Sequence, residues 1–150
     1  APFFVENAEA REILLRNPLI KQNLDMAHQC DLAIFSVGVV DIDSMLVQHG
    51  IVSRNEMSAL VAKGALGDVL THLFDKNGVE VHSSLSDRLI GLNIEDLSRI
   101  PLRILVAGGK EKYASIHAAL TGRWVDVLIT DQTTAGWLVT HEEETCIDDG

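Results

Sequence analysis

The feature that most constrains this chain is a strand, turn, helix and strand pattern near its C-terminal end. Residues 102–109, "LRILVAGG", read as an apolar strand that runs into two glycines. Residues 110–122, "KEKYASIHAALTG", read as a helix ended by Gly122, and residues 125–130, "VDVLIT", read as a second apolar strand. Strands joined through a helix run parallel, with a right-handed crossover. The pattern therefore predicts an α/β fold, mainly a parallel sheet with flanking helices.

Two further strand signals lie earlier in the chain. Residues 31–40, "DLAIFSVGVV", form a nearly continuous apolar run, which is typical of a central strand buried on both faces. Residues 67–82, "GDVLTHLFDKNGVEVH", read as two strands, and the Asn-Gly pair places the hairpin turn between them at residues 75–78.

Side chains that can accept hydrogen bonds from free backbone amides mark where several helices begin. Such a residue satisfies amides that have no partner within the helix. The predicted caps are Asn7, Asn17, Ser53 with Glu56 three residues later, and either Thr130 or Asp131.

Composition favours a folded cytoplasmic domain and argues against several partners. Apolar residues make up 47% of the 150 residues, more than a disordered chain carries. The formal net charge is −10 with scattered basic residues, so this chain alone should not bind DNA. No apolar run approaches the roughly 20 residues that cross a bilayer, so we expect no membrane partner. Cys30 and Cys146 have no metal or redox spacing, which favours reduced, cytoplasmic thiols.

The sequence lacks the usual motifs of metal sites and covalent hydrolases. The six histidines include no His-x-x-x-His pair, and no Gly-x-Ser-x-Gly elbow is present. We therefore expect no metal site and no covalent hydrolase, and we expect no cofactor.

Polar and glycine residues follow each of the three predicted parallel strands. Ligands of open parallel sheets bind outside the carboxyl ends of the strands, so these positions are candidates for a binding site. They are Ser36 and Gly38, then Gly108 and Gly109, then Thr130 and Asp131.

The Gly-Gly turn is compatible with a phosphate site. Gly108 and Gly109 leave room for close approach of backbone amides, and the helix that follows presents its N-terminus to an anion. Either Lys110 or Lys112 could add a positive charge, and the two point in different directions. The alternative is an ordinary turn with solvated lysines, because the stretch lacks the Gly-x-x-x-x-Gly-Lys frame.

A second glycine-rich corner, "GALGD", surrounds a carboxylate. Asp68 could accept hydrogen bonds from sugar hydroxyls. The alternative is an Asp that begins a strand and caps a turn.

These motifs together resemble a known family. The stretches "DLAIFSVG", "KGALGDVLTHLFDKNG" and "RIPLRILVAGGKEKYASIHAALTGRWVDVLITDQTTAGWLV" stand in the order and spacing of the effector-binding domain of SorC-family bacterial transcriptional regulators. That family is often grouped with DeoR-type sugar-operon regulators. The resemblance runs over residues 2–139, and its most specific parts are residues 64–68, residues 108–112 and the run ending at Asp131.

The resemblance implies a fold like that of ribose-5-phosphate isomerase and glucosamine-6-phosphate deaminase, the CoA transferase-like fold, used here for sensing and not for enzymatic activity. Members bind a phosphorylated sugar, which changes their oligomeric state or their grip on operator DNA. In this chain Asp68 would then face sugar hydroxyls, and Lys112, rather than Lys110, would meet the sugar or its phosphate. The expected ligand-binding residues are Gly38, Gly67, Asp68, Gly108, Gly109 and Lys112.

The resemblance also sets expectations about what accompanies these residues. The family places a helix-turn-helix domain, a strand and a Gly/Thr-rich phosphate loop before the stretch matched here. We therefore expect an incomplete effector domain over residues 1–139, an acidic tail over residues 140–150, operator DNA contact only through the N-terminal domain, and a homo-oligomer, either dimer or tetramer. Gln132 and Ser36 replace the usual Glu and Gly, and could tune which sugar fits.

Two other functions remain open from the sequence. One is a sugar-phosphate isomerase or deaminase on the same fold, which would need Asp68 or Asp131 as general base. The other is an oligomerisation module whose pocket no longer binds a ligand.

Overall fold

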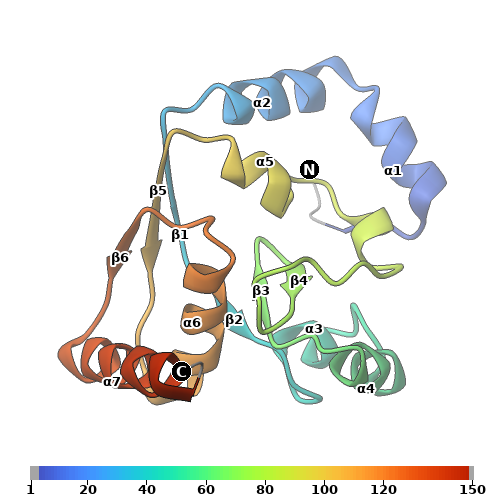
Figure 1. Cartoon of the computed structure of the whole chain (residues 1–150). Helices are drawn as coiled ribbons and strands as arrows, with labels where there is room; N and C mark the ends of the chain where they lie inside the picture. The colour runs from blue at the N-terminus through green and yellow to red at the C-terminus, as the bar shows by residue number, and fades with distance from the viewer. Residues whose placement is uncertain (1–3, 149–150) are drawn as a thin grey trace.

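The computed structural model describes residues 4–148, with side chains described as far as residue 141. Helices and strands alternate along most of the chain (Figure 1). In chain order they are α1 (Ala8–Leu15), α2 (Pro18–His28), β1 (Leu32–Phe35), β2 (Gly38–Val39), α3 (Met45–Gln48), α4 (Arg54–Ala62), β3 (Gly67–Val69), β4 (His72–Phe74), η1 (Ser86–Arg88), α5 (Ile94–Ser98), β5 (Leu102–Val106), η2 (Lys110–Lys112), α6 (Tyr113–Thr121), β6 (Val127–Ile129) and α7 (Gln132–Asp148).

The larger sheet contains the predicted strand–helix–strand unit. Its three strands run parallel in the order β1-β5-β6, and α6 connects β5 to β6. The α/β class with a parallel sheet and flanking helices is therefore confirmed.

The prediction of a central strand over residues 31–40 is wrong. β1 stops at Phe35 and forms an edge of the parallel sheet, while β5 takes the centre. Gly38 and Val39 belong instead to a second sheet. Within β1 only Phe35 is buried, because Leu32 and Ile34 point to the opposite, uncovered face. A strand with apolar residues on both faces does not itself reveal which face is covered.

The second sheet is small and antiparallel, with strand order β2-β3-β4. The hairpin turn between β3 and β4 lies at Leu70 and Thr71, where the sequence predicted none. The Asn-Gly turn also exists: the Gly78 amide donates to the Asp75 carbonyl, and Phe74 pairs with Glu80 beyond it. The sequence-based prediction therefore missed one turn, at which both residues have positive φ although neither is glycine.

The predicted helix caps are confirmed. Asn7 and Asn17 accept hydrogen bonds from Ala10 and Leu19 amides, and Ser53 with Glu56 forms a complete capping box. At the last helix the carboxylate of Asp131, rather than Thr130, accepts the hydrogen bond from the Thr134 amide.

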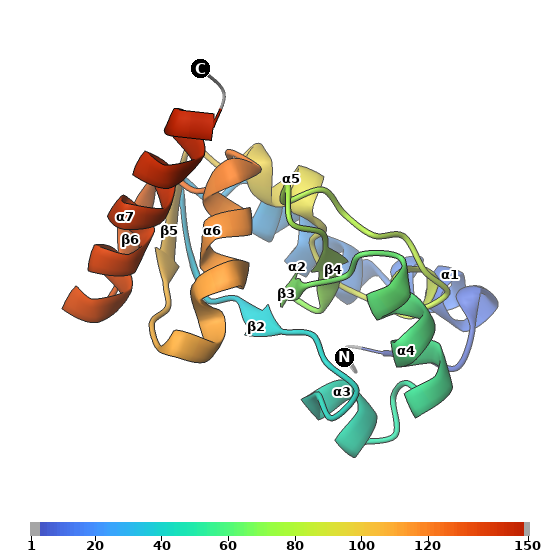
Figure 2. The same ribbon diagram turned by 60° about the horizontal axis from the view of Figure 1, so that its bottom comes forward.

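Helix α6 lies between the two sheets, as Figures 1 and 2 both show. Its buried residues Ile116 and Ala119 pack with Phe35, Phe74 and Trp124 in the main core. A separate, smaller core lies under α4, where Met57, Leu60 and Leu73 are among the buried residues. The two sheets thus share one helix as their common packing partner.

Helix α7 continues through the start of the predicted acidic tail. It runs from Gln132 to Asp148, whereas residues 149 and 150 lie outside the described part of the chain. The boundary after residue 139 stays a prediction.

Candidate functional site

The carboxylate of Asp68 lies directly across the small sheet from Gly38. The two residues are paired between β3 and β2. A Cβ atom at residue 38 would lie 2.0 Å from Oδ1 of Asp68, so only glycine leaves space for this side chain. Two residues of the predicted site are therefore adjacent, and one makes room for the other.

Asp68 is partly enclosed and feels two opposing influences. Burial raises the pKa of Asp68 above its ordinary value, while the Thr71 backbone N–H and the positive charge of Lys112 lower it. The Thr71 amide comes from the hairpin turn that follows β3. The Asp68 carboxylate thus accepts a hydrogen bond from the turn and is influenced by the charge of Lys112, and a carboxylate has room for further hydrogen bonds.

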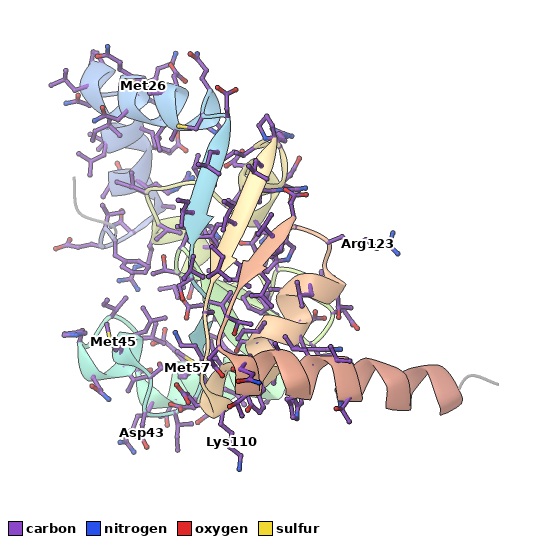
Figure 3. All side chains as sticks on the ribbon, turned by 90° about the vertical axis from the view of Figure 1, so that its left-hand side faces the viewer. Met26, Asp43, Met45, Met57, Lys110 and Arg123 are labelled. Atoms are coloured by element: carbon purple, nitrogen blue, oxygen red, sulfur yellow. The ribbon has the colours of Figure 1, made fainter. Side chains whose placement is uncertain are left out.

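The structure separates the two candidate lysines. Lys110 is exposed and points away from the molecule (Figure 3). Lys112 is half-buried and lines a hollow of about 420 Å³ at the carboxyl ends of the parallel strands. The other residues that line this hollow are Ser36, Val106, Ala107, Gly108, Ile129, Thr130 and Asp131. All three strand ends named from the sequence meet there, with Ser36 after β1, Gly108 after β5, and Thr130 and Asp131 after β6.

Gly108 and Gly109 both lie against the Asp131 carboxylate. A Cβ atom on Gly108 would lie 2.3 Å from Oδ2 of Asp131. The Gly109 amide donates to Oδ2 of Asp131 at 3.0 Å and to Oγ1 of Thr134 at 3.1 Å. Gly109 has φ of 102°, a conformation that glycine adopts at little cost. The Gly109 amide is therefore engaged within the protein.

Asp131 is strongly stabilised in its ionised form. The hydroxyl of Thr134 donates to Oδ2 at 2.6 Å, and the backbone amide of Thr134 donates to Oδ1 at 2.8 Å. Together with the Gly109 amide, these bonds lower the pKa of Asp131 to about 2. A carboxylate of this kind joins the ends of β5 and β6 to α7, and it is a weak base.

Gly67 has a packing role that is visible in its surroundings. A Cβ atom there would lie 2.6 Å from the ring of Phe74 and 2.8 Å from Oγ of Ser115. Glycine at this position lets β3 approach α6 closely, next to the residue that carries the Asp68 carboxylate.

A second, separate hollow has a volume of about 430 Å³. It is lined by Asp68, Leu70, Thr71, Ile90, Gly91 and Leu92. The Asp68 carboxylate thus faces a mostly apolar hollow, while Lys112 stands in the strand-end hollow.

Two polar residues at this site, Thr134 and Thr71, were not singled out from the sequence, whereas Thr130 was named among the strand-end candidates. Thr134 is fully buried, and its spacing three residues after Asp131 is a helix-cap signal that could have identified it. Thr130 lines the strand-end hollow, and its hydroxyl is buried with no hydrogen-bond partner among the described residues. Thr71 gave no signal, because neither Leu70 nor Thr71 is a typical residue for a tight turn.

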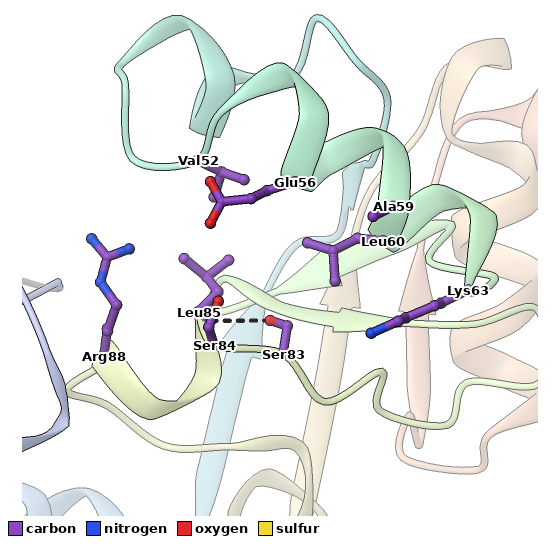
Figure 4. A pocket seen from close by; sticks show the side chains of 9 residues that line it. All are labelled: Val52, Glu56, Ala59, Leu60, Lys63, Ser83, Ser84, Leu85 and Arg88. Carbon is purple, nitrogen blue, oxygen red and sulfur yellow. Dashed lines mark hydrogen bonds between the residues drawn. The ribbon is translucent and has the colours of Figure 1, made fainter.

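A smaller hollow, of about 150 Å³, lies between α4 and η1 (Figure 4). Glu56 and Arg88 face each other across it, and Leu60 and Leu85 give it an apolar wall. It contains none of the predicted site residues.

Neither a metal site nor a membrane helix is found in the described part of the chain. Among residues 4–141, whose side chains the structure describes, no cluster of three or more His, Cys, Asp or Glu residues could hold a metal ion. No described helix is long and apolar enough to cross a membrane.

Comparison with protein families gives one match over nearly the whole chain. Residues 1–140 match the family described as "Putative sugar-binding domain". The deoxyribonucleoside regulator of Bacillus subtilis (strain 168) is 38% identical over 138 residues, which cover 92% of this chain and 44% of that protein.

Solved structures agree with the sequence comparison. The sugar-binding domain of a transcriptional repressor from Vibrio fischeri has a TM-score of 0.85 at 29% identity, covering 95% of this chain and 57% of that one. The full-length sorbitol operon regulator SorC from Klebsiella pneumoniae has a TM-score of 0.81 at 26% identity, covering 91% of this chain and 44% of that one. The chain thus spans about half the length of the proteins it matches.

Proposed function

This chain belongs to the family of sugar-binding domains found in SorC- and DeoR-type transcriptional regulators, and on that basis we propose that it senses a phosphorylated sugar. The relatives are named as regulators, not as enzymes. We propose both that the sugar carries a phosphate group and that the residues named below bind it.

The observation that carries the proposal is that Lys112, in the strand-end hollow, lies close enough to Asp68, in the wall of the second hollow, for its charge to lower the pKa of that carboxylate. They come from β3 and η2, yet the charge of Lys112 acts on the carboxylate of Asp68. A carboxylate accepts hydrogen bonds from neighbouring hydroxyls, and an ammonium group attracts a phosphate. A phosphorylated polyol offers both partners in one small molecule.

The engaged amide of Gly109 changes how the phosphate would be held. Since that N–H already donates to Asp131 and Thr134, it does not supply the phosphate contact. We assign the anion to the Lys112 ammonium, with the Thr130 hydroxyl as a further donor. The role of Gly108 and Gly109 is then to leave space for the Asp131 carboxylate beside the turn that follows β5. Gly38 likewise leaves space for the Asp68 side chain.

The proposed regulator uses this domain to control a DNA-binding domain outside residues 1–150. Binding of the sugar phosphate would change its homo-oligomeric state, dimer or tetramer, and its grip on operator DNA. With a net charge of −10, the present residues make a poor DNA surface, consistent with contact through another domain. We place the regulator in the cytoplasm, where phosphorylated sugars are made and consumed.

The isomerase or deaminase alternative is weakened by the state of Asp131. A general base needs a pKa near the working pH, whereas the pKa of Asp131 is about 2. That leaves Asp68, whose pKa is raised, as the one candidate base of the two predicted from the sequence.

A thermal-shift screen tests the proposal directly. The native polypeptide is titrated with pentose 5-phosphates, hexose 6-phosphates, the matching unphosphorylated sugars and inorganic phosphate. A ligand at 100 times its Kd adds about 2.7 kcal/mol to stability, so the cognate sugar phosphate should raise Tm by several degrees. A rise with the free sugar equal to that with its phosphate ester would contradict the phosphate assignment. Turnover of any of these compounds would contradict the sensor assignment.

A further inference from the structure

A polar hollow of about 360 Å³ lies apart from the strand-end hollow. Residues of α1, β4, η1 and α5 line it. It shares no lining residue with the strand-end hollow, and it shares only Gly91 with the hollow beside Asp68. The proposed function uses none of its ionisable residues, which are Arg11, Glu12, His72, Glu80, His82, Asp87 and Asp96.

A buried pair, His72 and Glu80, forms one wall of the polar hollow. Nδ1 of His72 lies 2.7 Å from Oε1 of Glu80, and the two side chains are only 7% and 15% exposed. His72 belongs to β4, and Glu80 follows the Asn-Gly turn that brings it back against Phe74. The backbone pairing of these two segments therefore holds the imidazole and the carboxylate together.

The pair leaves one nitrogen of the imidazole ring without a partner. An ionised carboxylate only accepts hydrogen bonds, so the Nδ1–H of His72 donates to Glu80. Nε2 then carries the lone pair of a neutral imidazole and acts as an acceptor. This Nε2 is buried and has no hydrogen-bond partner among the described residues. Because buried polar atoms nearly always have a partner, we expect a hydrogen-bond donor to complete the site.

The charge of the polar hollow favours a donor that is a cation. The guanidinium of Arg11 is already offset by the carboxylate of Glu12, at 3.7 Å. Among the described residues, neither Glu80 nor Asp87 forms an ion pair with a lysine or an arginine. A cation in the hollow would supply the positive charge that these carboxylates lack, whereas an anion would be repelled by them.

The cation that suits this wall is an ammonium group. Within residues 4–141, no set of three or more His, Cys, Asp or Glu side chains is placed to hold a metal ion. An ammonium group carries three N–H donors, so it can serve the imidazole nitrogen and a carboxylate oxygen at the same time. The volume of the hollow falls in the range of small-molecule sites, roughly 300–1,000 Å³.

We propose that the polar hollow binds a small amine. Its ammonium group donates to Nε2 of His72 and to the carboxylate of Glu80, and the charge of Asp87 adds to the attraction. His72 holds the Glu80 carboxylate in place through Nδ1, so each member of the pair orients the other.

The amine would also act on the hairpin that holds Asp68. His72 pairs with Val69 directly across the turn at Leu70 and Thr71, and the Thr71 backbone N–H donates to Asp68. A ligand bound to His72 is therefore placed to change the affinity for a ligand at Asp68, as a second effector does. This consequence rests on the proposed function, whereas the amine site itself does not.

Titration with two amines and two matched diols tests the site without any sugar. The native polypeptide, with ¹⁵N-labelled histidine, is titrated with putrescine and ethanolamine, and separately with 1,4-butanediol and ethylene glycol as their uncharged counterparts. Two-bond ¹H–¹⁵N spectra distinguish the two ring nitrogens, and the His72→Gln variant identifies the His72 signals. We expect an amine to bind with a Kd of about 1 mM or tighter and to shift the Nε2 resonance of His72. The diols should leave that resonance unchanged.

Substitutions in the wall of the polar hollow provide the second arm. Glu80→Gln keeps the shape of the side chain but removes its charge, so it should weaken amine binding at least 10-fold. Asp87→Asn changes an exposed residue that is not needed for folding and should weaken binding at least about 2-fold. His49→Gln is the control, since His49 is exposed and lies outside the hollow, and it should leave the affinity unchanged.

Three results would overturn the proposal. If neither amine binds, the partner of Nε2 is an ordered water and not a ligand. If the diols bind as tightly as the amines, the positive charge is not what the hollow recognises. If an amine binds while the Nε2 resonance and the Glu80→Gln affinity stay unchanged, its site lies elsewhere. Sugar phosphate is absent from every titration, so these failures are distinct from a failure of the thermal-shift screen.

Discussion

Gly38 and Asp68 face each other across two antiparallel strands with room for no atom beyond hydrogen at residue 38. A methyl group there would overlap the carboxylate, at 2.0 Å from Oδ1. Gly38→Ala should therefore displace the Asp68 side chain and weaken sugar-phosphate binding by at least about 10-fold, the equivalent of one hydrogen bond to a charged group. Isothermal calorimetry measures the loss. Gly136→Ala is the control, because a Cβ there meets nothing within 4 Å; an equal loss in both variants would remove the steric explanation.

Lys112 is predicted to be the working cation of the pair at the Gly-Gly turn. Lys112→Ala should reduce affinity for the sugar phosphate by about 10- to 150-fold, because a hydrogen bond to a charged group contributes about 1.5–3 kcal/mol. Lys110→Ala should leave affinity nearly unchanged, since that side chain is exposed and points to solvent. Calorimetry at two salt concentrations compares the variants, and equal effects of the two substitutions would refute the assignment.

The ionised Asp68 carboxylate should lower the folding stability of the domain while it contributes to sugar-phosphate binding. Because burial raises its pKa, the ionised carboxylate is less favourable in the folded state than in the unfolded one. Removing the charge should therefore raise Tm at pH 7, and the gain should vanish in acid, where Asp68 is protonated in both states. We expect Asp68→Asn to melt higher than wild type at pH 7 while losing sugar-phosphate binding. A lower Tm at pH 7 would show that the carboxylate stabilises the fold.

The charge of Asp131 has the opposite effect on folding stability from the charge of Asp68. Its pKa is lowered to about 2, so its ionised form adds stability above the unfolded-state pKa near 3.8, and that contribution disappears as pH falls through about 2. Asp131→Asn should therefore lower Tm at pH 7 and cost progressively less as the pH falls from about 4 to 2. Thermal melts across this range provide the measurement. A Tm difference that stays constant over the whole range would mean that the carboxylate's charge is not what matters.

Substitutions in the hairpin turn at Leu70 and Thr71 should increase the stability of the fold. Both residues have positive φ, 50° and 68°, which costs a non-glycine residue roughly 1–2 kcal/mol. Replacing them with the preferred pair, Leu70→Asn with Thr71→Gly, should raise the free energy of unfolding in urea by about 1 kcal/mol or more. The backbone N–H that Asp68 accepts is kept, so sugar-phosphate affinity should hold. Arg123→Gly, at the other described non-glycine residue with positive φ, is the comparison outside the site. Destabilisation of the hairpin variant would show that Leu70 contributes packing that outweighs the backbone cost.

Local signals in the sequence predicted local structure well. The strand–helix–strand unit, the capping box at Ser53 and the cap at Asn17 are all present, because each depends on residues close together in the chain. The Gly-Gly turn was located correctly at the end of β5.

Features that depend on distant contacts were not predictable in the same way. The apolar run in β1 does not encode that only one of its faces has a covering helix. The Asn77–Gly78 pair is a strong turn signal, so the prediction placed the turn there and not at Leu70 and Thr71. The conformation of Leu70 and Thr71 is imposed by their surroundings and not by residue type. The Gly109 amide donates to Asp131, which is 22 residues away in the sequence. The sequence alone therefore could not show that this N–H already has a hydrogen-bond partner within the protein.

Helix α6 touches the small sheet at both of its ends. Near its start, Ser115 lies against Gly67 of β3. At its far end, the Gly78 turn lies against Gly122, and the Trp124 indole N–H donates to the Gly78 carbonyl at 3.0 Å. The nine residues of α6 span about 13 Å at 1.5 Å per residue. A ligand that draws Lys112 toward Asp68 would therefore move a stiff helix whose far end is coupled to the Gly78 turn, so the displacement would reach that turn instead of being absorbed at the site.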